Sequence, residues 1–600
     1  MNLTRKQKER LKKLVKKTTL LEAVEILKID FDEAKNYLLD LWGKEKYQKR
    51  VKEKPEKLSS YQSSVNLNLR RWLTQNKKPL IFLAFLVFAV YAIALPNDFL
   101  SDDLPTIVQN PKINQVEYFL DPQFFPFHFN PRNFLLFLTY KISGLNPVFF
   151  RLLNLFFHLG VTYLLYFICG FFFSYPLSFF SVSLYAVHPI LVEGVTWISG
   201  GPYSNSAFFL LLAFACWILW IKNQKIWFYF LSLASFFSAL LFSERLVWLP
   251  VTLLLYETLF GNPKKSFKFL IPHFILAVWW TSYLLGLTGK RLTTLETVYY
   301  QQPGLDNPFI KIPIAVISYL ELIFWPKNLT FYHSELTYTQ GEFILRVIGF
   351  LFFLGLIFYF FKRERSLAFW LTFFLLTLSP TLTPLRISWV VAERYAYLGT
   401  FGVLVFAAFL IQKIGEKFKN QKISWIIFGF IVFSLSVRTI IRNLDWRNQD
   451  TLWIATAKVS PSSHQNHNNL GDMYVRHGQL EKAIEEFKKA IEIRPNYADA
   501  YHNLANVYLQ MGKNEIAKEN YQKALEFNPK LWQSHQNLAG LYFLEEKFDL
   551  VEEHLLKAIE IDPNNQEFYF NLGILYKKMG KKEKANEAFQ KANQLSTPGR

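Results

Sequence analysis

Residues 495–528, PNYADAYHNLANVYLQMGKNEIAKENYQKALEFN, are one unit of a repeat that decides the fold of the C-terminal region. The unit recurs every 34 residues, with its proline at Pro461, Pro495, Pro529 and Pro563. Leucine at positions 470, 504, 538 and 572 and tyrosine at 474, 508, 542 and 576 keep the same spacing. Such a period indicates supersecondary units that stack on one another, because one unit cannot bury its apolar face alone.

The residues within the unit identify the kind of repeat. Leucine followed by glycine or alanine, then tyrosine, alanine and proline at these offsets in 34 residues, is the signature of the tetratricopeptide repeat, a pair of helices. The small residues let the two helices pack closely, and the proline closes the unit. We therefore predict a tetratricopeptide-repeat domain of four repeats over residues 464–600. A connector with a capping helix is expected over residues 442–463.

The rest of the chain is dominated by apolar residues. Of its 600 residues 51% are hydrophobic and only 19% are charged, whereas charged residues make up nearer a quarter of an ordinary soluble protein. Apolar stretches occupy residues 79–95, 148–170, 176–192, 205–221, 226–242, 246–260, 267–287, 308–325, 343–361, 367–382, 395–412 and 423–441. They lack the alternation of barrel strands. The expected fold class is all-α, a polytopic transmembrane helix bundle over residues 79–441 followed by the C-terminal solenoid.

Lysine and arginine predict the orientation in the membrane. Residues 1–78 read as a basic cytoplasmic extension with short helices, ending in basic residues before the first apolar stretch. The net charge of +20 fits cytoplasmic loops and anionic lipid, and we expect no nucleic-acid partner, although a nucleic-acid-binding extension is the alternative. Cys169 and Cys216 both lie in apolar runs, so no disulfide is expected.

The number of spans follows from where the repeats must lie. Basic loops between the stretches place the last apolar stretch so that it leaves the cytoplasm, and this makes the repeat domain extracytoplasmic. Such a path needs an odd number of spans, so we expect about eleven from twelve stretches. Either residues 308–325 are re-entrant, or residues 226–260 cross once with a break at residues 243–245. The chain is thus expected to be an integral, multi-pass membrane protein, of the plasma membrane in a prokaryote.

An acidic pair follows the first apolar stretch. Asp102 and Asp103 stand in the loop NDFLSDDL (97–104), which the predicted orientation places outside. One carboxylate there could accept the proton of an attacking hydroxyl during sugar transfer from a lipid phosphate. The alternative is a structural helix N-cap made by Ser101 or Asp102.

Further polar residues border the apolar stretches on the same side. Arginine offers a planar fork of donors suited to phosphate, so Arg132 and Arg394 are the candidate phosphate ligands; for Arg394 the alternative is a pair with Glu393 or snorkelling. Polar groups at membrane depth face a wet cavity or each other, although a proline kink beside a satisfied histidine explains His188 as well. The candidate site-lining residues are His188, Glu193, Glu393, Tyr395, Arg151 and His158.

Six segments carry a resemblance to a known family. They are SDDLPTIVQNPKI (101–113), FNPRNFLLFLTYKISG (129–144), FFRLLNLFFHLG (149–160), YAVHPILVEGVTWISG (185–200), WPKNLTFYHSE (325–335) and WVVAERYAYLGTFG (389–402). With DWRNQDTLW (445–453), they resemble, in the same order, the transmembrane-and-tetratricopeptide-repeat O-mannosyltransferases of the GT-C fold. The resemblance implies a polyprenyl-phosphate sugar donor, a protein Ser or Thr hydroxyl as acceptor, an inverting transfer, and Asp102 or Asp103 as the catalytic carboxylate.

The repeats carry a ladder of asparagines. Asn469, Asn503, Asn537 and Asn571 resemble the asparagines that line the peptide groove of the O-GlcNAc transferase repeats. One asparagine side chain both donates and accepts, which suits a peptide backbone. The alternative is that each amide bonds only within its own repeat. The first interpretation makes the repeats a binding site for a protein or peptide acceptor.

Two other functions fit parts of the sequence. A ligase or polymerase of lipid-linked oligosaccharides combines many spans with repeats but does not need the acidic pair, and a membrane-anchored scaffold does not need so many apolar segments. Some GT-C enzymes need a divalent ion such as Mg²⁺ or Mn²⁺ and others do not. No histidine or cysteine cluster with ligand spacing is present, so no metal ligands are assigned and the lipid-linked sugar is the one small-molecule partner expected.

Overall fold

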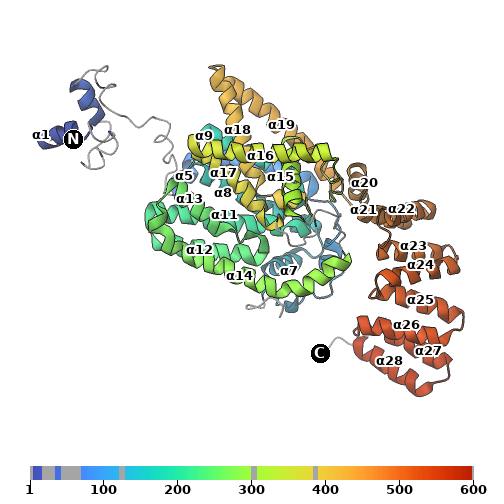
Figure 1. The fold of residues 1–600 in the computed structure, drawn as a ribbon. Helices are drawn as coiled ribbons and strands as arrows, with labels where there is room; N and C mark the ends of the chain where they lie inside the picture. Colours follow the sequence, from blue (N-terminus) through green and yellow to red (C-terminus); the bar gives the residue numbers. More distant parts are fainter. Residues whose placement is uncertain are drawn as a thin grey trace.

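The computed structural model describes residues 69–120, 129–298, 307–382 and 389–596, together with parts of the first 47 residues. In these ranges the chain is helical apart from its loops and one isolated β-bridge between Leu120 and Phe129, which confirms the all-α prediction. Figure 1 shows a large helical module, from α5 to α19, beside a curved stack of short helices, from α20 to α28. Helix α1 (Arg5–Leu14) lies apart, at the opposite side of the module from the stack.

The module contains helix at each of the twelve predicted apolar stretches. Its helices are α5 (Leu69–Gln75), α6 (Lys77–Tyr91), α7 (Pro131–Ser143), α8 (Pro147–Cys169), α9 (Tyr175–Ala186), α10 (Val192–Thr196), α11 (Pro202–Asn223), α12 (Ile226–Phe242), α13 (Leu249–Phe260), α14 (Pro263–Val298), α15 (Pro308–Phe324), α16 (Gln340–Arg363), α17 (Arg365–Leu378), α18 (Thr400–Lys417) and α19 (Gln421–Asp445). Helix α7 has no counterpart among the predicted stretches, because its sequence mixes polar and apolar residues.

Five of the described helices are long and apolar enough to cross a membrane. They cover residues 77–94, 147–169, 198–223, 340–363 and 421–445, and the bent pair formed by residues 175–186 and 189–196 makes a sixth if it is one span. The bend of 51° falls at Pro189, which cannot donate a backbone hydrogen bond to continue α9. Helices α12 and α13 are shorter and are separated by a break at residues 243–248. The total of eleven spans stays a prediction.

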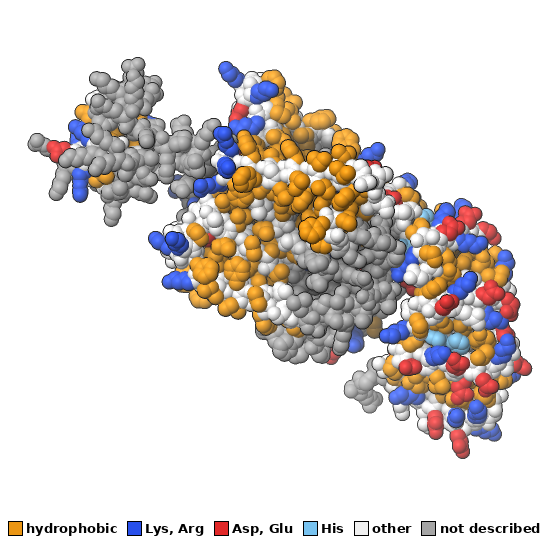
Figure 2. Space-filling view, viewed as in Figure 1, with side chains coloured by type: hydrophobic (Ala, Val, Ile, Leu, Met, Phe, Trp, Pro, Cys, Tyr) orange, Lys and Arg blue, Asp and Glu red, His pale blue; other side chains and the backbone are white. Residues whose placement is uncertain are grey.

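The surface separates the two parts of the molecule. Figure 2 shows apolar side chains over much of the module, whereas the repeats carry interspersed acidic and basic side chains. Helix α16 illustrates the first kind of surface, since Phe352 is 72% exposed and Leu351 59% exposed. An apolar face of this extent is stable in lipid but not in water. The chain is therefore a membrane protein with a water-exposed repeat domain.

The stack consists of α20 and four helix pairs. These are α20 (Gln449–Val459), then α21 (His464–Arg476) with α22 (Leu480–Ile493), α23 (Ala498–Gln510) with α24 (Asn514–Phe527), α25 (Trp532–Leu544) with α26 (Phe548–Ile561), and α27 (Gln566–Lys578) with α28 (Lys582–Ser596). Small residues permit the close pairing. A Cβ on Gly471 would lie 2.5 Å from Phe487, and one on Gly573 would lie 2.6 Å from Phe589, so larger side chains are excluded at these positions.

Candidate active site

The loop after the first span is hydrogen-bonded to the C-terminal end of the last span, α19. The side-chain amide of Asn97 donates to the carbonyl oxygens of Asn443 and Trp446 at 3.2 and 2.9 Å. Arg151, buried on α8, donates to the carbonyl oxygens of Asn97 and Asp98 and to that of Thr196, the last at 3.0 Å. Arg151 therefore holds the loop in place through backbone oxygens.

The two acidic residues of this loop have different environments. Asp103 is fully buried, and its two carboxylate oxygens accept the backbone N–H groups of Leu100 at 3.1 Å and Ser199 at 2.8 Å. Burial raises the pKa of Asp103 above its usual value, and these hydrogen bonds and Arg151 oppose the rise. Asp102 is exposed. Asp103 thus anchors the loop to residues 198–200, whereas the carboxylate of Asp102 faces outward.

Arg132 lies within electrostatic range of both carboxylates. It stands at the second position of α7, whose first turn is capped by the Asn130 side chain accepting from the backbone N–H of Asn133 at 3.1 Å. Asp103, Asp102 and Tyr118 all act electrostatically on its guanidinium. Its Nε and Nη2 are buried and have no hydrogen-bond partner among the residues described. Buried donors without acceptors are costly, so this guanidinium is suited to a ligand that supplies oxygens.

Arg394 forms a buried ion pair with Glu193. Its Nη1 donates to Oε1 of Glu193, and its backbone N–H donates to Oε2 at 2.9 Å. The side chains are 11% and 1% exposed. The expected alternative of a pair with Glu393 is wrong, because consecutive residues on the turn at 393–396 point to different sides. Arg394 is therefore neutralised by a carboxylate, unlike Arg132.

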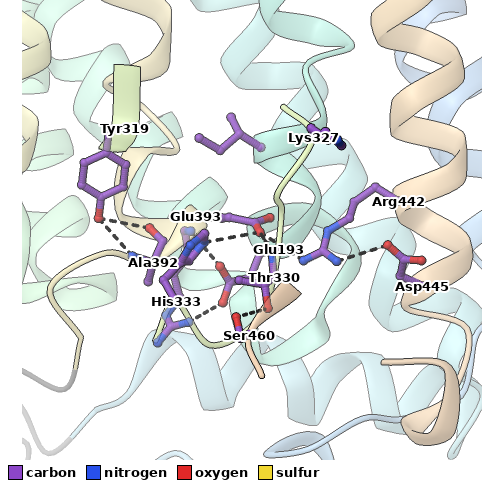
Figure 3. Close-up of polar contacts among 12 residues, drawn as sticks. Glu193, Tyr319, Lys327, Thr330, His333, Ala392, Glu393, Arg442, Asp445 and Ser460 are labelled. Atoms are coloured by element: carbon purple, nitrogen blue, oxygen red, sulfur yellow. Dashed lines mark hydrogen bonds and ion pairs between the residues drawn. The ribbon is translucent and has the colours of Figure 1, made fainter. Parts of the chain in front are cut away.

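Glu393 forms a second ion pair, with Arg442, as Figure 3 shows. Its Oε1 accepts from Arg442 Nη2 at 3.1 Å and from the backbone N–H of Thr330, and it lies 3.7 Å from His333 Nε2. Arg442 also donates to Asp445 at 3.2 Å. This network joins the loop before α16 to the last span.

Two site residues were missed from the sequence. Arg245 donates a short hydrogen bond to the Tyr203 hydroxyl, and its guanidinium lies 4.1 Å from the centre of the Tyr395 ring. Arg132 and Arg394 also interact electrostatically with Tyr203. Arg245 therefore contacts Tyr203 directly, and Arg132 and Arg394 lie within electrostatic range of the same tyrosine. The signal for Arg245 was its place in the break between the two apolar stretches 226–242 and 246–260.

The two histidines contact protein groups only, within the described residues. His188 Nε2 lies 2.9 Å from the carbonyl oxygen of Ile323, and its Nδ1 accepts the N–H of Ile190 at 3.3 Å. His158 Nδ1 lies 2.7 Å from the Tyr397 hydroxyl. Both are buried, so they brace the helices around the site and present no ring nitrogen to the acidic loop.

The asparagine ladder links neighbouring parts of the solenoid. Asn503 donates to Asn468 at 3.0 Å, and Asn537 donates to Asn506 at 3.0 Å and to the Tyr521 hydroxyl at 2.9 Å, in each case in the preceding repeat. Asn469 donates to the Tyr332 hydroxyl of the module at 3.4 Å. Asn571 takes the corresponding position in the fourth repeat, where it is half-buried.

The described residues contain no group of three or more histidine, cysteine, aspartate or glutamate side chains that could hold a metal ion. At the acidic loop both oxygens of Asp103 accept backbone amides, and the guanidinium of Arg132 provides the neighbouring cation. With both Asp103 oxygens already occupied and a guanidinium nearby, this site fits an anionic ligand better than a bound metal cation.

Comparison with known proteins first identifies the repeats. Tetratricopeptide-repeat models match residues 471–512, 498–531, 533–565 and 554–586, so the C-terminal domain is a tetratricopeptide-repeat domain. A solved structure titled "Crystal structure of MamA" shares 24% identity and covers 24% of this chain and 84% of its own, with a TM-score of 0.23.

Curated relatives extend the similarity beyond the repeats. The chain is 27% identical over 401 residues to "Protein O-mannosyl-transferase TMTC3" of Homo sapiens, covering 60% of this chain and 44% of that protein. It is 24% identical over 450 residues to "Protein O-mannosyl-transferase F38B6.6" of Caenorhabditis elegans, covering 71% of this chain and 64% of that protein. The chain is therefore similar to proteins named protein O-mannosyl-transferases over a region larger than its repeat domain. It spans between two fifths and two thirds of the length of these relatives.

Proposed function

We propose that this protein is a membrane glycosyltransferase of the GT-C type. It transfers a sugar, mannose in keeping with its relatives' names, from a polyprenyl-phosphate donor to a hydroxyl of a protein acceptor on the extracytoplasmic face. The observation that carries the proposal is the exposed carboxylate of Asp102, in the loop after the first span, within electrostatic range of Arg132. The Nε and Nη2 donors of Arg132 are buried and have no partner among the described residues.

The reaction needs a base for the acceptor and a cation for the leaving group. The acceptor oxygen attacks the anomeric carbon from the face opposite the phosphate, and the bond between that carbon and the phosphate oxygen breaks, which inverts the configuration. The carboxylate of Asp102 takes the hydroxyl proton. The departing polyprenyl phosphate keeps the electron pair, and the Nε and Nη2 donors of Arg132 bind its oxygens.

The other residues have positioning roles in this proposal. Asp103 and Arg151 fix the loop that carries Asp102. The Glu193 and Arg394 pair fixes the turn that carries Tyr395, and Arg245 lies over that ring. The donor tail lies in the lipid against the module, and the repeats bind the acceptor or a partner protein.

The test is turnover by the purified full-length protein in lipid nanodiscs. It is incubated with a panel of polyprenyl-phosphate monosaccharides and a Ser/Thr-rich peptide, and the peptide is examined by mass spectrometry. We expect one added hexose from one donor, with the opposite anomeric configuration. Addition of a whole oligosaccharide, or no addition from any donor while the protein remains folded, would overturn the proposal.

A further inference from the structure

A cavity lies where the membrane module meets the repeats. Its volume of about 680 Å³ falls within the roughly 300–1,000 Å³ of ligand pockets. Three walls come from the module: the end of α15, the loop at residues 325–339 and the start of α16. The fourth wall is the end of α20, at Val459 and Ser460, directly before the first repeat. We call this the seam pocket.

The seam pocket has fixed walls. Ser460 donates to the Thr330 hydroxyl at 3.1 Å, and the backbone N–H and hydroxyl of Ser462 donate to Glu335 at 2.9 and 2.6 Å. The rings of Tyr332 and Trp453 stack with centres 5.9 Å apart. The pocket is therefore a built feature of the junction, and its shape does not depend on a chance approach of two domains.

The inner wall reaches the ion pairs of the candidate active site. His333 lines the pocket, and its Nε2 is buried without a hydrogen-bond partner among the residues described, 3.7 Å from Glu393. Thr330, also in the wall, donates its N–H to the same carboxylate, as Figure 3 shows. Glu393 precedes Arg394 in the chain. A ligand in the pocket would thus contact Thr330 and His333, which lie against Glu393. It would also contact the end of α20, directly before the first repeat.

The lining determines the chemistry of the occupant. Leu320 and Leu336 supply apolar surface, and Asn328 and Ser318 supply groups that donate and accept. Glu321 and Glu335 outnumber the one arginine, Arg346, which is paired with Glu321 at 3.0 Å. This excess of negative charge repels a phosphate head group, and the polar groups do not suit a hydrocarbon tail. An extended polypeptide, neutral or basic, satisfies both the apolar and the polar parts.

We infer that the seam pocket binds the segment of the acceptor polypeptide that flanks the residue receiving the sugar. This inference rests on the proposed function and adds an acceptor subsite to it. The acceptor would run from the repeats through the pocket, with lysine or arginine preferred over aspartate or glutamate beside the modified hydroxyl.

The test fills the pocket and measures acceptor and donor separately. In nanodiscs, L320W is expected to raise the KM for a lysine-flanked Ser/Thr peptide about tenfold while the KM for the donor changes less than about twofold. The matched control is L351W, on the exposed face of α16, which should leave both constants unchanged. Unchanged acceptor KM in an active, folded L320W protein would overturn the inference.

A second measurement does not depend on turnover. Benzoylphenylalanine in place of Leu336, followed by illumination with a fluorescein-labelled form of the same peptide, is expected to give a crosslink that excess unlabelled peptide removes. A crosslink to lipid alone, or none, would overturn the pocket assignment. A competed crosslink at position 336, together with no sugar transfer by the folded wild-type protein, would instead refute the proposed function.

Discussion

The carboxylates of Asp102 and Asp103 should differ in what they contribute, and substitution by asparagine separates them. Asparagine keeps the size of the side chain but removes its negative charge and one acceptor oxygen. At position 102, which is exposed, the change removes a base without removing a structural contact. We expect D102N to lower kcat about 10²- to 10⁴-fold, the range of a lost general base, with an unchanged thermal midpoint.

At position 103 the same change has a structural cost. The two carboxylate oxygens accept the backbone N–H groups of Leu100 and Ser199, at 3.1 and 2.8 Å, in a fully buried place. An amide oxygen can accept one of these, and the amide NH₂ group would then face the other N–H donor. An unpaired buried donor costs about 1–3 kcal/mol, so D103N should lower the free energy of unfolding by that amount.

The assay is turnover of purified protein together with thermal unfolding followed by intrinsic fluorescence. D103N is expected to unfold at a lower temperature and to retain part of its activity at low temperature, where the loop is still folded. The reasoning would be refuted if D102N kept wild-type turnover while a stably folded D103N lost all turnover, since Asp103 would then be the base.

Three other predictions concern Arg132, the buried pair of Glu193 and Arg394, and two histidines of the repeats. R132Q, which removes the unpartnered guanidinium donors, should raise the KM for the donor and lower kcat, measured with the acceptor peptide held at saturation. E193Q leaves the Arg394 charge buried without its partner and should destabilise the protein by about 3–5 kcal/mol, seen as a lowered thermal midpoint; an unchanged midpoint would contradict the buried pair. Burial lowers the pKa of His502 and His554 to about 4, so the folded repeats bind these protons less readily than the unfolded chain. The two neutral histidines therefore contribute to the free energy of unfolding at pH 7, and this contribution is lost as the pH falls from about 6.5 towards 4. Hydrogen exchange of α23–α26, corrected for the intrinsic rate, should be faster at pH 5 than at pH 7. Equal protection at the two pH values would contradict this prediction.

The repeats could be predicted almost completely because their information is local. Each unit carries its own leucine, tyrosine and proline positions, and Gly471 and Gly573 stand where a Cβ would strike a phenylalanine of the paired helix. The apolar stretches were equally readable, since composition alone separates them from their polar connections. How many of them cross the membrane depends on packing and on helix length, which the sequence does not encode locally.

The site was only partly readable for the same reason. The acidic pair could be found because it directly follows the first apolar stretch, but its division into a buried and an exposed carboxylate depends on Ser199, which comes 96 residues later. Arg394 was predicted as a phosphate ligand, with a pair with the adjacent Glu393 as the alternative, because its observed partner, Glu193, is 201 residues away in the sequence. In the sequence Arg245 marks only a break between two apolar stretches, because its partner Tyr203 is 42 residues earlier in the chain.

The fixed junction between the module and the repeats also sets a length scale. Tyr332 and Trp453 stack, and Ser460 and Ser462 are bonded to the loop before α16, so the start of the solenoid cannot swing freely about the membrane. A polypeptide held along the solenoid would therefore present its hydroxyls at a constant offset, counted in residues, from the segment being held. The position of the modified residue would then depend on its distance along the polypeptide from the segment that the solenoid binds.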